Sequence, residues 1–334
     1  MTQGRGASAG DYGAPLFLAW QLTNRCGPRC VHCCEESGPD KGWPDELSEA
    51  QALRVAREAV ACAIPYAAFG GGEPLDVPHA WKVFEVLRRG GVSLKIETNG
   101  LSIDDAAADR LRDLGVDCIQ ISLDGARAET HERMRPGGSF AGACAALQRL
   151  AERGLAPEAV FAPSRLNIAE AAEAFSLAAR SGARAFVTGP LMRLGRAAEA
   201  WSELAPAPEE WRACVERLEE RARSEAGVKL SVYPWDIVEE VRRRRDSPQA
   251  MVLVVPDGKV KLLNALPFYC ADLRRQSLAE AWSLVPGAWR SPEVREFTDR
   301  LLKDPSLLRH ANERWPIGSL GRSRPPLCGS PTAA

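Results

Sequence analysis

Short apolar runs alternate with amphipathic segments over the N-terminal part of the chain. The apolar runs predict strands over 16–22, 66–69, 93–97, 118–123, 159–162 and 185–188. Helical spacing between them predicts helices over 44–62, with Ser48 as its N-cap, and over 77–89, 103–114, 140–153 and 168–180. Alternating strands and helices predict an α/β fold with a parallel sheet. Six such repeats are typical of a partial (β/α)6 barrel of the TIM type, in which chemistry lies on the loops that follow the strands.

The pattern changes after Arg196. Charged segments predict helices over 209–224 and 239–246, and the four arginines of the second are interpreted as a solvated face. Apolar runs on either side of Asp257-Gly258 predict a hairpin over 251–263, and two short helices follow over 277–284 and 292–302. We therefore expect three parts: a flexible tail over 1–14, a barrel over 15–200, and a smaller α+β extension over 201–334 that is loose from Pro325.

Charge and hydropathy narrow the function classes. The net charge of −1 gives no reason to expect nucleic acid or an anionic membrane as a partner. No apolar run is long enough to span a bilayer. The N-terminus lacks the basic and then apolar order of a signal peptide. These features predict a cytoplasmic protein.

The cysteines are unevenly spaced. Four of the ten fall within residues 26–34, which in a large intracellular chain favours metal binding over a disulfide framework. Cys26, Cys30 and Cys33 have the spacing C-x3-C-x2-C directly after the first predicted strand. Three thiolates on one loop can hold three corners of a cubane iron–sulfur cluster and leave the fourth iron open. A structural zinc ion normally takes four protein ligands, so Cys34 is interpreted as a spare thiol.

This cysteine loop resembles that of the radical S-adenosylmethionine (SAM) superfamily. In that family the amine and carboxylate of SAM bind the open iron. The residue before the third cysteine is often aromatic and packs near the adenine, and here it is His32. A solvated loop residue is the alternative for His32.

Later motifs strengthen the resemblance. Residues 69–74 (FGGGEP) are similar to the family's GGEP motif, which implies that Gly71, Gly72 and Glu73 bind the amine of SAM. A Gly-rich turn is the alternative. Residues 97–100 (ETNG) imply polar contacts from Thr98 and Asn99 to SAM, although an Asn-Gly turn also explains Asn99.

Residues 121–125 (ISLDG) resemble the SLDG stretch of members with C-terminal SPASM or twitch domains. The resemblance implies that Ser122 and Asp124 face the ribose or the carboxylate of SAM, and that Arg135 pairs with a carboxylate. Asn167 and the segment 195–197 are similar to elements on the last barrel strands.

The C-terminal part resembles a degenerate SPASM or twitch domain. Full SPASM domains have a cysteine after the hairpin, where this chain has Leu262, Leu263 and Asn264. Only Cys270 and Cys328 remain in this half of the chain. The departure predicts that the scaffold is kept without auxiliary clusters, so that one [4Fe–4S] cluster and SAM are the cofactors.

The resemblance implies reductive cleavage of SAM to a 5′-deoxyadenosyl radical, which takes hydrogen from a small molecule. An external donor such as flavodoxin or ferredoxin supplies the electron. Residues 33–40 and the short C-terminus resemble decarboxylases that act on cytosylglucuronic acid in nucleoside-antibiotic biosynthesis. We therefore expect a lyase for a carboxylated sugar nucleoside. Arginines are the best partners for such a carboxylate, and the candidates near strand ends are Arg135, Arg165, Arg193 and Arg196.

Three alternatives stay open. The first is a radical SAM peptide maturase, although no peptide-recognition module is evident at the N-terminus. The second is a sugar or nucleoside epimerase or dehydratase. The third is a non-catalytic iron–sulfur protein for electron transfer, against which the two motifs assigned to SAM count.

Overall fold

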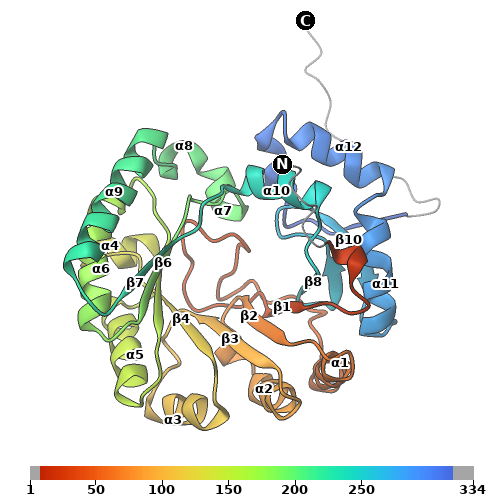
Figure 1. Cartoon of the computed structure of the whole chain (residues 1–334), viewed down its shortest axis with the longest axis horizontal. Coiled ribbons are helices and arrows are strands. Elements are labelled where there is room, and N and C mark those ends of the chain that lie inside the picture. The colour runs from red at the N-terminus through yellow and green to blue at the C-terminus, as the bar shows by residue number, and fades with distance from the viewer. Residues whose placement is uncertain (1–7, 319–334) are drawn as a thin grey trace, which may run out of the picture.

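The computed structural model describes residues 8–318 and contains one continuous sheet of eleven strands (Figure 1). Along the sheet the order is β11-β10-β9-β8-β1-β2-β3-β4-β5-β6-β7, and every neighbouring pair from β8 to β7 is parallel. The parallel strands are β1 (Phe17–Thr23), β2 (Tyr66–Gly71), β3 (Ser93–Thr98), β4 (Cys118–Ser122), β5 (Glu158–Phe161), β6 (Ala185–Thr188), β7 (Lys229–Val232) and β8 (Met251–Val254). The predicted α/β partial barrel is confirmed.

Helices cover the outer face of this curved sheet (Figure 1). Those between the strands are α1 (Glu49–Ala61), α2 (Ala80–Arg89), α3 (Asp105–Leu114), α4 (Ala128–Met134), α5 (Phe140–Glu152) and α6 (Ala171–Arg180). The first helix begins later than its periodicity predicts, because the side chain of Ser48 accepts a hydrogen bond from the backbone of Gln51 and caps it. The core lies between helices and sheet, where Phe69 of β2 packs edge-on against Phe84 of α2 with ring centroids 4.7 Å apart.

The C-terminal extension continues the barrel sheet. The hairpin of β8 and β9 (Lys259–Lys261) is antiparallel, as predicted, and β8 pairs with β1. On the other side, β7 pairs with β6, so strands from beyond residue 200 flank both ends of the predicted barrel. The remaining elements are α7 (Gly195–Glu199), α8 (Trp201–Leu204), α9 (Pro208–Ser224), α10 (Ile237–Asp246), β10 (Phe268–Asp272), α11 (Leu278–Ala288), α12 (Pro292–Leu301) and β11 (Trp315–Pro316).

The N-terminal segment packs against the rest of the structure from residue 8 onward. Of the predicted flexible tail, the part from residue 8 is packed: Ala9 is buried and its N–H donates to Pro248, and Trp282 donates to the carbonyl of Tyr12. The predicted loose end and Cys328 lie outside the described residues. Within residues 8–318, no helix combines the length and the apolar character needed to cross a bilayer.

Candidate functional site

A cavity of about 690 Å³ lies at the carboxyl ends of the parallel strands. The loops after β1 to β4 bring most of the predicted site residues to its wall. These are Cys26, Cys30, His32, Cys33, Gly71, Gly72, Glu73, Thr98, Asn99, Ser122 and Arg135. Asp124, Arg193 and Arg196 are not part of the wall.

Each of the three predicted cluster cysteines accepts a hydrogen bond at sulfur. Asn99 Nδ2 lies 3.7 Å from Cys26 Sγ, Arg135 Nη1 lies 3.5 Å from Cys30 Sγ, and the N–H of Ser37 lies 3.3 Å from Cys33 Sγ. Burial raises the pKa of Cys26 to about 12 and also raises that of Cys30. Without metal the thiols of Cys26 and Cys30 are therefore protonated, and binding of iron must displace their protons. The hydrogen-bond donors are placed to stabilise the thiolates that result.

The donor set suits a cluster better than a single ion. Within residues 8–318, no three His, Cys, Asp or Glu side chains form a site for one metal ion. A cubane offers a different iron to each thiolate, so its ligands need not converge on one point. Three thiols on one loop, lining one cavity, fit three corners of a [4Fe–4S] cluster.

Glu73 joins the ends of β2 and β3. Gly72 before it leaves no room for a side chain, because a Cβ there would lie 2.0 Å from the carbonyl oxygen of Arg25. The carboxylate of Glu73 accepts hydrogen bonds from Thr98 Oγ1 at 2.8 Å and from the N–H of Asn99 at 2.9 Å. Burial raises the pKa of Glu73 to about 7. The predicted contact of Glu73 with the amine of SAM stays a prediction.

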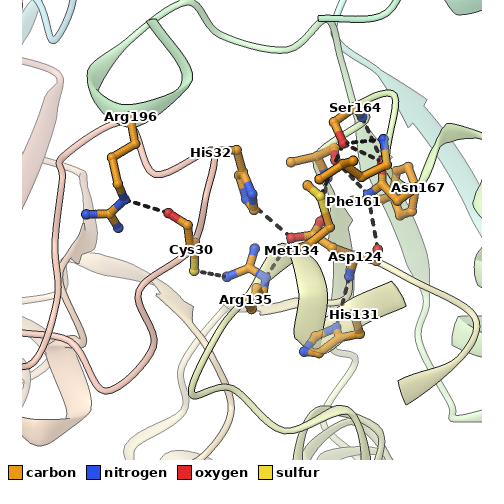
Figure 2. A network of polar contacts seen from close by, with 12 residues as sticks. Cys30, His32, Asp124, His131, Met134, Arg135, Phe161, Ser164, Asn167 and Arg196 are labelled. Carbon is orange, nitrogen blue, oxygen red and sulfur yellow. Dashed lines mark hydrogen bonds and ion pairs between the residues drawn. The ribbon is translucent and has the colours of Figure 1, made fainter. Parts of the chain in front are cut away.

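Asp124 is not among the residues that line the cavity, but it contacts His32 and Arg135, which are (Figure 2). Its side chain is fully buried, and Oδ2 accepts a hydrogen bond from Arg135 Nε at 2.6 Å and lies 3.3 Å from His32 Nε2. Oδ1 accepts from the N–H of Ala162 at 2.7 Å. Burial alone would raise the pKa of Asp124, but the charge of Arg135 and the other donors outweigh it, so the pKa lies below its usual value. Asp124 therefore orients two residues that do line the cavity.

His32 is buried and is therefore not a solvated loop residue. Burial lowers its pKa to about 4, so the ring is neutral at pH 7. With Nε2 toward Asp124, its Nδ1 is buried and has no hydrogen-bond partner among the described residues. A buried polar atom of this kind beside a cavity fits a polar group of a ligand.

The predicted arginines are not brought together. Arg196 donates to the carbonyl oxygens of Cys30 and Ser37 at 2.7 Å each (Figure 2 shows the first contact). Arg193 lies over the ring of Trp201, and Arg165 donates to the carbonyl of Ser202. Of the four candidates, only Arg135 lines the cavity. Sequence spacing places a residue near a strand end, but it does not set the direction of a long side chain.

Another part of the wall holds residues that were not predicted as site residues. It includes Met192, Tyr233, Trp235 and Leu263, which come from loops after β6, β7 and β9. The hydroxyl of Tyr233 donates to Glu240 Oε2 at 2.7 Å. The alternation of apolar and polar residues over 228–232 was the available signal for β7 and the aromatic pair after it.

Comparison with known proteins finds a family likeness in the N-terminal part. Residues 20–162 match the family described as the Radical SAM superfamily. These residues are similar to a radical SAM domain over less than half of the chain. The match begins within β1, includes all three cluster cysteines and ends just after β5.

Curated relatives share this domain. The chain is 39% identical over 196 residues to the mycofactocin maturase MftC of Mycobacterium ulcerans, which is 58% of this chain and 52% of that protein. It is 28% identical over 295 residues to an AdoMet-dependent heme synthase of Methanosarcina barkeri, which is 80% of this chain and 82% of that protein. The chain thus spans about half the length of the maturases that it matches.

Solved structures share the fold of the partial barrel together with the extension. Streptococcus suis SuiB bound to S-adenosylmethionine matches with a TM-score of 0.70 over 90% of this chain and 76% of SuiB, at 12% identity. Native anSMEcpe with bound AdoMet matches with a TM-score of 0.61 over 84% of this chain and 82% of that protein, at 15% identity. At these identities the likeness establishes the fold alone.

Proposed function

We propose that this protein is a radical SAM enzyme that modifies a peptide. The proposal is carried by the match of residues 20–162 to the radical SAM superfamily, in which three cysteines line one cavity and each accept a hydrogen bond at sulfur. Two likenesses support a peptide as the substrate. One is to a relative named as a maturase, and the other is to the structure of SuiB bound to precursor peptide SuiA. These likenesses favour the peptide maturase over the nucleoside decarboxylase that the sequence analysis expected.

The residues that line the cavity are the candidates for binding the two cofactors. Cys26, Cys30 and Cys33 would hold the [4Fe–4S] cluster, and the loops after β2, β3 and β4 with His32 would hold SAM. Together these groups supply one-electron cleavage of SAM and a radical that removes hydrogen from the substrate. The protein contributes a fixed loop, hydrogen bonds to the sulfurs and a cavity that limits access of water.

The charges at the cavity also favour a peptide substrate over a uronic acid. Carboxylates of Glu35, Glu97, Asp236 and Glu240 line it, and the arginine among its lining residues, Arg135, is paired with Asp124. A uronic acid would meet this wall without a free cation to bind its carboxylate among the described residues that line it. The apolar wall around Met192, Tyr233 and Trp235 is better suited to peptide side chains.

The cofactor proposal has a direct test. Anaerobically reconstituted protein should bind about four irons per chain, as one [4Fe–4S] cluster requires. With dithionite and SAM it should release 5′-deoxyadenosine, and Cys30→Ala should not, because one of three cluster ligands is lost. Cys270→Ala is the matched control: this partly buried thiol contacts the carbonyl of Val260, away from the cavity wall, and should keep both properties. A wild-type chain with about eight or more irons would contradict a single cluster.

The substrate needs a separate experiment. Active enzyme is incubated in parallel with a short peptide encoded beside its gene and with cytosylglucuronic acid, and both are followed by mass spectrometry. We expect a mass change in the peptide only. Loss of CO₂ from cytosylglucuronic acid with an unchanged peptide would restore the decarboxylase and reject the maturase.

A further inference from the structure

The cysteine loop is held from outside by a residue near the end of the described chain. Asn312 Nδ2 donates to the carbonyl oxygen of Cys34 at 2.8 Å and to Glu36 Oε2 at 2.7 Å. Asn312 follows a 3-10 helix over Pro305–His310 and is 278 positions from Cys34 in sequence. The contact therefore exists only because the extension folds back over the barrel.

A second segment holds the same loop beside it. Arg196 donates through its side chain to the carbonyls of Cys30 and Ser37 and through its N–H to that of Cys33. At Gly195, where φ is +50°, a Cβ would lie 2.4 Å from the carbonyl oxygen of Cys34. The carbonyls of Cys30, Cys33, Cys34 and Ser37 are thus all bound by groups from distant parts of the chain.

The loop needs this support because its backbone is strained. Glu36 has φ of +56° and is one of two residues other than glycine with positive φ in the range 8–318. A side chain is unfavourable in this left-handed conformation, which persists only where surrounding contacts hold it. Asn312 supplies such contacts, to the Glu36 carboxylate and to the carbonyl two residues before it.

We propose that Asn312 is a positioning residue for the cluster: it holds the turn over Cys34–Glu36 and thereby fixes Cys33 for iron. The proposal rests on the cluster assignment under the proposed function. It makes the C-terminal extension part of the cluster site without giving it a metal ligand.

The isosteric variant Asn312→Asp tests this role. It removes the donor and places a carboxylate beside the carbonyl of Cys34 and the carboxylate of Glu36. The measurements are the rate at which a chelator removes iron from anaerobically reconstituted protein, the EPR spectrum of the reduced cluster, and Tm. We expect iron release about five- to tenfold faster than in wild type, as loss of a hydrogen bond of ordinary strength implies, and an altered EPR spectrum.

Two further variants separate positioning from general damage. The first combines Asn312→Asp with Glu36→Gln, so that the new amide at position 36 can donate to the new carboxylate at position 312. Iron release from this double variant should return part of the way to the wild-type rate. Arg309→Ala is the control, because Arg309 is exposed and its one described side-chain contact is to Ser306 of the same short helix. It should behave as wild type.

The outcomes are distinct. Should Asn312→Asp fold poorly, Asn312→Ala removes the donor without adding charge and should still release iron faster than wild type. Wild-type release rates and EPR spectra in both variants would overturn the positioning role while leaving the proposed function intact. A wild-type chain that takes up no iron would overturn both.

Discussion

The two walls of the cavity differ in how their side chains are held. On the wall built from the loops after β1 to β4, polar groups are buried and held by hydrogen bonds: Glu73 is bonded to Thr98, and Arg135 is bonded to Asp124, which lies outside the wall. After β6 and β7, the wall carries large side chains that are exposed: Tyr233 is 45% and Met192 41% exposed. The first wall is fixed in geometry, whereas the second offers surface for packing.

The difference matches two tasks. A cofactor with fixed donors and acceptors needs a preorganised wall, since misplaced polar groups cost binding. A substrate recognised by packing tolerates a less rigid wall. We therefore expect substitutions on the first wall to change stability and cluster binding, and those on the second to change substrate turnover alone.

The largest effect is expected for Asp124→Asn. The variant leaves the guanidinium of Arg135, only 12% exposed, without its anionic partner. Breaking a buried pair typically costs about 3–5 kcal/mol of unfolding free energy. Urea unfolding of metal-free protein measures it. Asp105→Asn is the matched control, because that carboxylate is 75% exposed and its pair with Arg153 should contribute about 0–1 kcal/mol. Equal losses in the two variants would contradict the distinction between buried and exposed pairs.

A smaller, pH-dependent effect is expected for Glu73→Gln. Because the pKa of Glu73 is raised to about 7 from 4.5, the folded state holds more protons than the unfolded state between these values. The contribution of Glu73 to the free energy of unfolding is therefore complete below pH 4.5. It decreases as the pH rises from 4.5 to about 7. The glutamine variant should lose this part of the pH dependence.

Denaturant titrations at about pH 5 and about pH 7.5 compare the two proteins over the range in which the group changes its protonation. Glu97→Gln provides the control, since Glu97 is on the same strand as Thr98 and half exposed. An identical pH dependence in wild type and Glu73→Gln would show that the carboxyl group does not titrate in this range.

The smallest effect on the protein itself is expected for Trp235→Ala. Trp235 lines the apolar wall, packs edge-on against Tyr233 and has the guanidinium of Arg243 over its ring at 4.0 Å. Release of 5′-deoxyadenosine without substrate should stay within about twofold of wild type, while peptide conversion falls about tenfold or more, as loss of an aromatic anchor implies. Trp201→Ala, outside the cavity, should change neither. Lost SAM cleavage in Trp235→Ala would show that the second wall also serves the cofactor.

Strands and their order along the chain were predictable because apolar periodicity is local. The predicted strands over 66–69 and 185–188 lie within β2 and at β6, and the cysteine loop follows β1 as expected. Strand β7 was missed because its alternation extends over only a few residues and none of its four residues is buried. The aromatic residues after it, which form much of the second wall, were missed with it.

What the sequence determined by itself was the barrel, the cysteine spacing and the motifs that end each strand, since all of these depend on neighbours in the chain. Only the tertiary structure decided which side chains meet. Asp124 does not line the cavity but holds Arg135 and His32, Arg196 binds loop carbonyls, and Asn312 reaches Cys34 from a position far along the chain. The reason is physical. The spacing along a chain determines on which strand or loop a residue lies, but the direction and the partner of a long polar side chain depend on segments that only folding brings near.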